Sequence, residues 1–531
     1  MAAPQPRLGS ARVAELAASV CLATDLGMSF PWEHGLQATV AAMRLCDLLG
    51  LDQATRRNAY YVSLLAYSGC TADAVDGIPI FGGSVTDHFV PVIWGSKVQQ
   101  IRGLVKAMPD SAAPPWVALG QVAARLPRAV RNQTRQQVTL CEVAEVLADR
   151  LGLPPDIHGQ FYHLTERYDG TGVLARSRGD DIPLGLRIAL VARDASYLQV
   201  VGGPAHVRAA MRQRAGNAHD PEVAEALIRN PSEVLAAPDE GSSWDAVLDL
   251  EPGPHLTLDE DELDRALAAM GDFADLVSPS LSGHSSGVAL LAEQAARQLG
   301  MGYQDARVVR RAGLVQDIGR AAVRPRVWER RGALSPDERE QVRLHSYHTE
   351  RILGRSPQLR ELATLAGCHH ERLDGSGYHK GLTAATLPVP ARLLAAADMF
   401  RALTQPRPHR PAQTERTAAR VLTEEAQAQR LDGDAVAAVL TAAGQSLSGP
   451  VPRPGGLTDR ETQVVGLVAR GLATKQVARA LNISPKTADH HLQSAYRKIG
   501  VTSRAAVSLY AMEHGLVAWG ELPMGGRPTP S

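Results

Sequence analysis

The sequence predicts an all-α protein, with two tandem helical bundles followed by a small four-helix module. Three observations support this prediction. Apolar residues recur at three- and four-residue intervals, whereas alternation of β-branched residues is scarce. Long segments of the first half recur in the second half. A Pro- and Gly-rich stretch, 446–456, precedes a basic C-terminal segment, which is typical of a flexible linker before a separate domain.

Length and composition bound the class of protein. The 531 residues favour about three or four domains at roughly 150 residues each. Because 56 basic residues balance 56 acidic ones, any affinity for nucleic acid has to come from a local patch. Five dispersed cysteines without a CxxC pair predict a reducing compartment. No apolar run of about 18 residues is present, so we expect a cytoplasmic protein with no membrane partner.

The repeat has two gapless blocks. Residues 34–51 align with 284–301 at an offset of 284 − 34 = 250, and this register extends to 64–70 on 314–320. ERYDGTG at 166–172 aligns with ERLDGSG at 371–377, at an offset of 371 − 166 = 205. The first copy therefore carries about 45 extra residues between its blocks, which we expect around 72–130. We expect ERYDGTG to form a turn, in which Gly170 and Gly172 adopt backbone angles that other residues avoid.

These patterns predict the following division of the chain. The first helical domain spans 1–245, the second 255–445, the linker 446–456, the C-terminal module 457–518 and a flexible tail 519–531.

The second copy contains side chains suited to a divalent metal. Imidazole and carboxylate groups suit Fe, Mn or Zn, and a shared carboxylate can bridge two ions. A single histidine on a helix is more often a packed or solvated residue than a ligand, so the prediction depends on the whole set. The six candidate ligands are His284, Asp317, His345, His369, His370 and Asp398.

The segments that contain these residues resemble the HD superfamily of metal-dependent phosphohydrolases, and specifically its HD-GYP branch. The resemblance covers about 280–445 and lies in HSSGVALLA, LVQDIGR, RLHSYHTERIL, HHERLDGSGYHKGL and RLLAAADMFRALTQPRPHRPA. It implies an all-helical fold that cleaves cyclic dinucleotides or other phosphoesters with a metal-activated water. It also implies Asp317 and Arg320 as candidate catalytic residues.

Three departures from the family pattern bear on activity. Gln316 stands where the family has the His of its central His-Asp dyad, and an amide oxygen is a weaker ligand than imidazole. Arg320 replaces a Lys, and a guanidinium binds phosphate but does not act as a proton donor. His379 replaces the Pro of Gly-Tyr-Pro. We therefore expect weakened or lost hydrolysis, with binding of a metal or a phosphorylated ligand retained.

The first copy departs further. It keeps His34, but Ala66 and Tyr67 stand at the counterparts of the dyad, and Arg193 stands at the counterpart of Asp398. Leu164 and Thr165 replace the His pair, and Cys141 lies near the place of His345. One remaining His cannot hold a metal cluster, so we expect this copy to be metal-free. It would pack on the second copy or offer a remodelled pocket for a small ligand.

The C-terminal module has the signals of four short helices. Thr458 and Glu461 form a capping-box pattern, Thr474 begins the second helix, and Ser484 with Pro485 begins the third. Ser503 precedes the last helix at 504–515. The spacing is typical of a helix-turn-helix. Residues 457–516 contain eight Lys or Arg and four acids, a net charge of 8 − 4 = +4 in a neutral chain.

The module resembles the LuxR/NarL-type DNA-binding domain along LTDRETQVVGLVARGLATKQVARALNISPKTADHHLQSAYRKIGV. The resemblance implies that phosphates are contacted by Lys475, Lys486, Thr487, His491 and Lys498, and that base edges are faced by Asp489, His490 and Gln493. It also implies a dimer contact through the last helix. The alternative is a helix-turn-helix used only for protein contacts, which the local charge disfavours.

Our leading hypothesis is a transcriptional regulator that binds double-stranded DNA as a homodimer. Its tandem HD-like region would sense a nucleotide or other phosphorylated small molecule and shift the population of DNA-binding states. The second hypothesis is a metal-dependent phosphohydrolase, such as a cyclic-dinucleotide phosphodiesterase, that the DNA-binding tail only localises. A third is a structural oligomerisation scaffold, for which no ligand would change DNA affinity.

Overall fold

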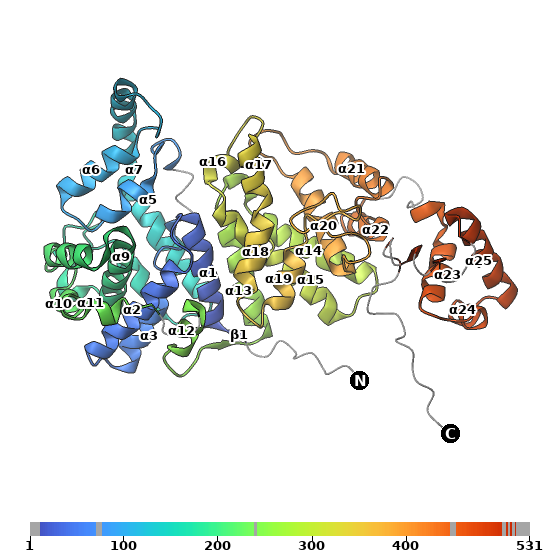
Figure 1. Ribbon diagram of the computed structural model, residues 1–531, viewed down its shortest axis with the longest axis horizontal. Coiled ribbons are helices and arrows are strands. Elements are labelled where there is room, and N and C mark those ends of the chain that lie inside the picture. Colours follow the sequence, from blue (N-terminus) through green and yellow to red (C-terminus); the bar gives the residue numbers. More distant parts are fainter. Residues whose placement is uncertain are drawn as a thin grey trace. The chain divides into compact units, whose positions relative to one another are not determined.

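The protein is described by a computed structural model over residues 11–70, 77–237, 242–445 and 453–501, with 506, 507, 510, 511, 514 and 516. Within these residues the regular structure is helical apart from one short antiparallel pair, β1 (Ala11–Arg12) with β2 (Thr257–Leu258) (Figure 1). The predicted all-α class is therefore confirmed. No helix of the described residues combines the length and apolarity needed to cross a bilayer.

The chain forms two compact units. One comprises residues 1–282 and 317–360, and the other comprises 283–316 and 361–531. The helices of the first unit, including short 3-10 turns written η, are α1 (Val13–Gly27), α2 (His34–Leu48), α3 (Gln53–Leu65), α5 (Val85–His88), η1 (Val90–Val92), α6 (Lys97–Ala107), α7 (Pro115–Arg150), α8 (Pro155–His158), η2 (Gly159–His163), η3 (Gly179–Asp181), α9 (Leu184–Arg214), α10 (Pro221–Arg229), α11 (Pro231–Val234), α12 (Ser243–Asp249), α13 (Glu260–Asp275), η4 (Pro279–Leu281), η5 (Ile318–Ala322), α16 (Pro325–Trp328), α17 (Pro336–Arg343) and α18 (His345–Leu353).

The second unit contains the rest of the second copy and the C-terminal module. Its helices are α14 (His284–Gln298), α15 (Tyr303–Val315), α19 (Arg360–Ala366), α20 (Val389–Thr404), α21 (Glu415–Gln427), α22 (Gly433–Ala442), η6 (Pro454–Gly456), α23 (Asp459–Ala469), α24 (Thr474–Ala480) and α25 (Pro485–Ile499). The predicted domain boundaries remain predictions, because the compact units divide the chain by contacts and not at those positions.

The two copies have matching helices. α2 and α14 begin at the aligned residues His34 and His284, and each follows a residue in the left-handed conformation, Glu33 with φ 66° and Gly283 with φ 69°. α3 and α15 share the offset of 250 at both ends, and α9 and α20 begin at aligned positions with the offset of 205. Helix boundaries thus follow the sequence repeat, which supports the predicted duplication.

The turn of each copy has one glycine with a positive φ and one closely packed glycine. Gly170 and Gly375 have φ of 74° and 78°, a region that glycine adopts without steric cost. The expectation that Gly172 also needs such an angle is wrong, because its φ is not positive. A Cβ at Gly172 would lie 2.6 Å from the Glu166 carboxylate, so close packing requires the glycine.

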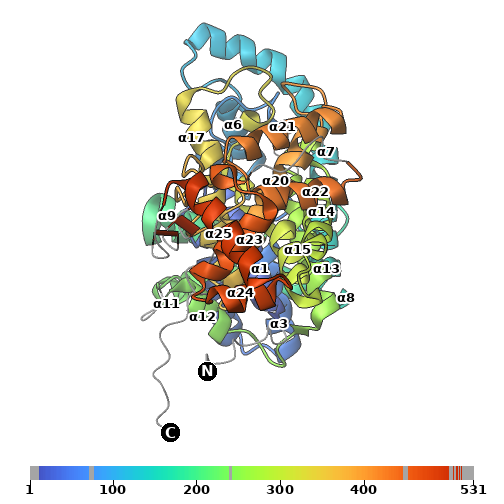
Figure 2. The ribbon, with the colours of Figure 1, turned by 90° about the vertical axis from the view of Figure 1, so that its right-hand side faces the viewer.

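The C-terminal module forms its predicted helices. Thr458 and Glu461 make the capping box of α23, and the Ser484 hydroxyl accepts from the Thr487 N–H at the start of α25. α23, α24 and α25 share one small core that includes Val465, Val477 and Leu492 (Figure 2). Ser503 and most of the predicted last helix lie outside the described residues, as do 446–452 of the linker and the tail 519–531.

Candidate metal centre and candidate nucleic-acid interface

Asp317 and His345 are brought together by the contact of η5 with α18. The Asp317 Oδ1 and His345 Nε2 atoms are 3.3 Å apart, and both side chains are buried. The Gly319 N–H donates to the Thr349 hydroxyl at 3.0 Å. A Cβ at Gly319 would lie 2.1 Å from the His345 carbonyl oxygen, so this close approach of the two backbones requires glycine.

Residues of the first copy support the same two elements. A Cβ at Gly27, at the end of α1, would lie 3.1 Å from the Ala321 carbonyl oxygen of η5. The Arg351 guanidinium of α18 lies 3.8 Å from the centroid of the Trp32 ring, and Arg355 forms an ion pair with Glu33. The first copy therefore contributes to the position of the segments that contain Asp317 and His345.

Arg320 is held at Asp317. Its Nε lies 2.9 Å from Asp317 Oδ1, and its guanidinium carbon lies 5.5 Å from the centroid of the Trp328 ring. The side chain is buried. Since an Arg side chain stays protonated, it neutralises part of the charge that Asp317 would offer to a cation.

Asp398, on α20, is surrounded by imidazole and amide nitrogens. His284 Nε2 lies 3.0 Å from its Oδ1, the Gln316 amide nitrogen donates to the same oxygen at 3.3 Å, and His370 Nδ1 lies 3.8 Å from Oδ2. Burial acts to raise the pKa of Asp398, but the hydrogen bond from His284 and the charges of the nearby imidazoles outweigh it and hold the pKa below the usual range. The carboxylate is therefore ionised.

The tautomers of two histidines are set by backbone carbonyls. His369 Nδ1 lies 2.6 Å from the Ala366 carbonyl oxygen, and His345 Nδ1 contacts the Val342 carbonyl oxygen. A carbonyl oxygen only accepts, so Nδ1 carries the proton in both rings. In the neutral form of each ring, the Nε2 lone pair is available for a ligand bond, which is the arrangement common for metal-binding histidines.

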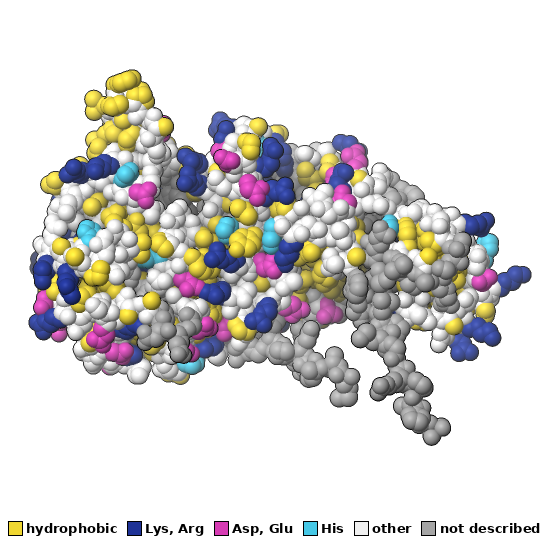
Figure 3. Space-filling model, viewed as in Figure 1, with side chains coloured by type: hydrophobic (Ala, Val, Ile, Leu, Met, Phe, Trp, Pro, Cys, Tyr) yellow, Lys and Arg dark blue, Asp and Glu magenta, His cyan; other side chains and the backbone are white. Residues whose placement is uncertain are grey.

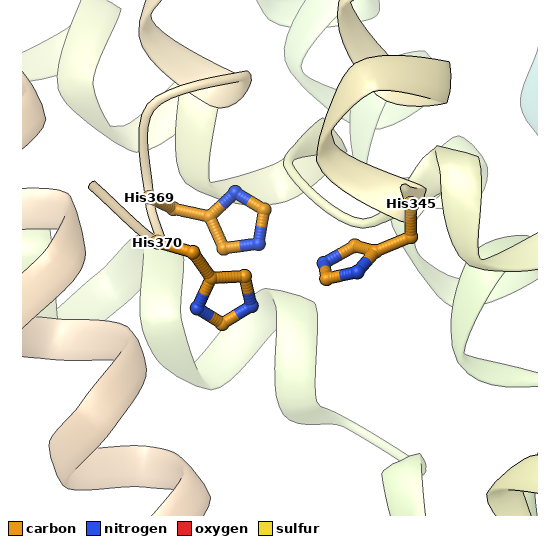
Figure 4. Close-up of side chains that lie close together, drawn as sticks. All are labelled: His345, His369 and His370. Atoms are coloured by element: carbon orange, nitrogen blue, oxygen red, sulfur yellow. The ribbon is translucent and has the colours of Figure 1, made fainter. Parts of the chain in front are cut away.

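The six predicted ligands form two groups of three. The ligand atoms of His345, His369 and His370 all lie within 4.8 Å of one another (Figure 4). The same limit holds for those of His284, Asp317 and Asp398. Imidazole nitrogens and carboxylate oxygens at this spacing, mostly buried, fit a divalent transition metal such as Fe, Mn or Zn.

Two residues of this region escaped prediction as site residues. Gln405 places its side-chain oxygen 2.8 Å from His284 Nδ1, and nothing in the sequence pattern indicated this. Glu371 is fully buried and accepts from the Lys380 and Leu382 N–H groups at 2.7 and 2.9 Å, which fixes the loop after the His pair. The sequence repeat could have indicated Glu371, because Glu166 occupies the aligned position in the first copy. In the structure, Glu166 likewise accepts from a loop N–H, that of Arg176.

In the first copy, a buried cation stands at the position aligned with Asp398, a predicted metal ligand. Arg193 is 1% exposed, donates to the Ser63 carbonyl oxygen and lies over the Tyr67 ring. Burial, assisted by the Arg193 charge, lowers the pKa of His34 to about 3, so this imidazole is neutral. Cys141 Sγ lies 4.0 Å from the Thr165 hydroxyl. That this copy is metal-free remains a prediction.

The predicted nucleic-acid contacts mostly lie on the outer surface of α24 and α25. Lys475, Lys486, Thr487, Asp489, His490, Gln493 and Lys498 are exposed, and His491 is half-buried. Lys498 has an additional partner, since its Nζ lies 2.7 Å from the buried Glu461 carboxylate. Ser494 also donates to Glu461, at 2.6 Å. The phosphate and base assignments remain predictions.

Comparison with known proteins agrees with this architecture. The family described as HD domain matches residues 268–435, and the family of bacterial regulatory proteins of the LuxR type matches residues 456–511. The chain combines an HD domain with a LuxR-family helix-turn-helix domain. The solved structure of V-cGAP3, a cyclic GMP-AMP-specific phosphodiesterase of Vibrio cholerae, covers 83% of this HD–LuxR chain and 99% of its own length. It is 26% identical, with a TM-score of 0.56.

Sequence relatives match both parts of the HD–LuxR chain. The V. cholerae protein named 3'3'-cGAMP-specific phosphodiesterase 3 is 28% identical over 410 residues, 75% of this chain and 88% of its own length. The V. cholerae protein named 3'3'-cGAMP-specific phosphodiesterase 1 is 34% identical over 167 residues, which are 31% of this chain and 38% of that protein's length. Transcriptional regulatory protein MctR of Rhizobium johnstonii is 37% identical over 62 residues, 12% of this chain and 29% of its own.

Proposed function

We propose that this HD–LuxR protein is a DNA-binding transcriptional regulator whose tandem HD-like region acts as a sensory and dimerisation module, with hydrolytic activity weakened or lost. The observation that supports it is that each of the two site carboxylates already has a nitrogen-bearing side chain of the protein beside it. The Gln316 amide donates to Asp398, and the Arg320 guanidinium lies beside Asp317. Both carboxylates therefore already have partners that a catalytic metal would have to compete with.

The donor set still suits a metal, and a bound divalent ion would supply Lewis-acid activation of a water molecule. His369 and His345, with Nδ1 held by carbonyl groups, would present Nε2 to it. Gln316 offers only a neutral amide in place of imidazole, which weakens the site. Arg320 would bind a phosphate in a bidentate manner and would not transfer a proton. The residues favour retention of a phosphorylated ligand over its turnover.

A ligand bound in this way would act by shifting populations. If it favours one arrangement of the tandem region, it changes the fraction of chains that present the helix-turn-helix productively to DNA. The effector we propose is a cyclic dinucleotide or another phosphorylated small molecule, because the relatives with matching HD domains are named for cyclic GMP-AMP.

The test combines DNA binding with ligand binding in the full-length protein. We expect 3'3'-cGAMP or a related cyclic dinucleotide to bind without appreciable turnover and to change the affinity for a genomic fragment found by a genome-wide binding map. Lys486→Ala should weaken promoter retention and leave ligand binding intact. Retention of promoter DNA that is unaffected by this substitution would exclude the regulator hypothesis.

The second candidate is an active metal-dependent phosphodiesterase that the helix-turn-helix localises. Retention of all six ligand positions supports it. It predicts robust hydrolysis of a cyclic dinucleotide by the metal-loaded wild type, with loss in Asp317→Ala. Our proposal predicts slow or no turnover in the wild type and a higher metal occupancy in Gln316→His, measured by elemental analysis of the purified proteins.

A further inference from the structure

The segment 97–141 of the first copy, which includes α6 and most of α7, is strongly basic. It contains seven cationic residues and one acidic residue, a net charge of 7 − 1 = +6 in a chain whose total is zero. The acid, Asp110, forms an ion pair with Arg125 at 3.2 Å. This local excess is larger than the +4 of the C-terminal module, and the HD-GYP resemblance does not explain it.

The N-terminal half of α7 presents an apolar stripe to solvent. Trp116, Leu119, Ala123, Pro127 and Val130 recur at intervals of three or four residues, which places them on one face of the helix. All five are exposed, Trp116 and Leu119 at 76% and 73%. Such large exposed apolar side chains in one row indicate a binding surface.

A different face of the same helix holds it on the protein. Val122, Leu126 and Ala129 pack in a small cluster with Ile80 and Met108. Because this other face of α7 is packed against the protein, the apolar stripe faces solvent.

The cations border this stripe. Arg128, Arg131 and Arg135 follow on the adjoining face of α7 and are exposed. α6 adds the exposed pair Val98 and Ile101, together with exposed Lys97, Arg102 and Lys106. Figure 3 shows hydrophobic side chains gathered at the projecting end above the α6 and α7 labels of Figure 1, with Lys and Arg side chains below them. We call the exposed apolar and basic residues of α6 and α7 named here the α6–α7 surface.

We propose that the α6–α7 surface binds the interface of an anionic phospholipid membrane. The cations complement the lipid phosphates, and Trp116, Leu119 and Val130 lie where they could enter the boundary between headgroups and acyl chains. Nucleic acid would use the cations but would leave the aliphatic side chains in water. A second copy of the same face would bring its own arginines against these and be repelled.

The expected absence of a membrane partner rested on the lack of a long apolar run, and the described residues contain no helix able to span a bilayer. A helix that lies in the interface has a different signature. It is amphipathic, with Trp and aliphatic residues on one face and Lys or Arg on another, as α7 is.

The test is cosedimentation of the full-length protein with large unilamellar vesicles. We expect binding to phosphatidylglycerol mixed with phosphatidylcholine, little binding to phosphatidylcholine alone, and release by salt. Trp116→Gln with Leu119→Gln should lower the partition coefficient about tenfold or more. Arg128→Gln with Arg131→Gln should lower it about fivefold for each arginine removed, on anionic vesicles only.

Matched controls come from the same unit. Val146→Gln removes an exposed apolar side chain of α7 outside the stripe, and Arg208→Gln with Arg212→Gln removes exposed charges of α9. Both should bind like the wild type, and far-ultraviolet circular dichroism checks that all variants are folded.

Three results would overturn the proposal. The first is equal binding of wild type and Trp116→Gln/Leu119→Gln to anionic vesicles. The second is a loss of duplex-DNA affinity in Arg128→Gln/Arg131→Gln with vesicle binding unchanged, which would assign the cations to nucleic acid. The third is conversion of a dimer to a monomer by Trp116→Gln/Leu119→Gln in sedimentation velocity, with no vesicle binding by the wild type, which would assign the stripe to a contact between copies.

Discussion

The Arg193 guanidinium lies over the Tyr67 ring, with its central carbon 4.2 Å from the ring centroid. In the register of the repeat these two residues are the counterparts of Asp398 and Asp317. Where the second copy has two carboxylates that suit a cation, the first copy has a cation of its own stacked on an aromatic face. The first copy therefore retains the helical framework of the fold and has an internal cation–aromatic contact at the positions of the two carboxylates.

Arg193→Ala should destabilise the first copy. The substitution removes a guanidinium that is almost fully buried, its bond to the Ser63 carbonyl and its stacking on Tyr67. We expect a loss of about 3 kcal/mol in the free energy of unfolding, measured by urea denaturation. Arg208→Ala, at an exposed position of the same helix, is the control and should change little. Equal stabilities of the two variants would contradict the structural role of Arg193.

Asp25 should make the stability of the protein fall as pH rises through the acidic range. Burial raises the pKa of Asp25 to about 7, against the lowering effects of Arg193 and of the hydrogen bond from the Gly35 N–H. The native state therefore holds a proton that the unfolded chain releases near pH 3.8. Between these two pH values the native state binds more protons, so its stability is largest at the acidic end and is lost progressively up to pH 7.

Asp25→Asn removes this titration. We expect the stability difference between wild type and Asp25→Asn to change by up to about 4 kcal/mol from pH 4 to pH 7, in favour of the variant at pH 7. The measurement is urea denaturation of both proteins at matched pH values. A difference that stays constant across this range would show that Asp25 is ionised throughout.

Glu461 should make the stability of the helix-turn-helix fall as pH falls, whereas the contribution of Asp25 falls as pH rises. Burial opposes its ionisation, but hydrogen bonds from Lys498, Ser494 and the Thr458 N–H lower its pKa to about 2. The stabilisation is complete above the unfolded value of 4.5 and is lost as pH falls toward 2. Glu461→Gln should cost about 2 kcal/mol at pH 7, seen as faster hydrogen exchange in peptides from 457–501. Peptides of the first copy should exchange unchanged and serve as the internal control.

Gly319→Ala should weaken metal binding more than it weakens the fold. The added Cβ would lie 2.1 Å from the His345 carbonyl oxygen, so η5 has to move away from α18 and take Asp317 with it. We expect a several-fold fall in Mn²⁺ affinity measured by isothermal titration calorimetry. Gly332→Ala, where an added Cβ meets no atom within 4 Å, is the control. The same affinity in both variants would show that η5 tolerates the displacement.

Lys486→Ala and Gln493→Ala should separate phosphate contacts from base contacts. Lys486 stands exposed in the first turn of α25, so its loss should weaken binding to all duplexes and reduce the salt slope by about 1. Gln493, exposed further along the helix, should mainly change sequence preference. Fluorescence anisotropy across a series of operator variants and salt concentrations distinguishes the two effects. Identical profiles for both variants would refute the proposed orientation of α25.

From the sequence alone, the all-α class, the repeat and the helix starts at Thr474 and Pro485 could be predicted. These features follow from local rules, since caps and three- and four-residue spacing act within one or two turns. The sequence also identified the six candidate ligands. The role of Gly172 could not be predicted, because a positive φ and close packing both favour glycine in a sequence. Only the folded structure shows that close packing is the reason at this position.

Long-range packing, in contrast, sets which groups lie beside the site carboxylates and which apolar faces are covered. Gln316 and Asp398 are separated by 82 residues along the chain, so no local pattern could pair them. The spacing of Trp116, Leu119 and Val130 is the same as that of a buried helix face, and only packing shows that this face remains exposed. The physical reason is that periodicity specifies which residues share a face, whereas long-range contacts specify what that face meets.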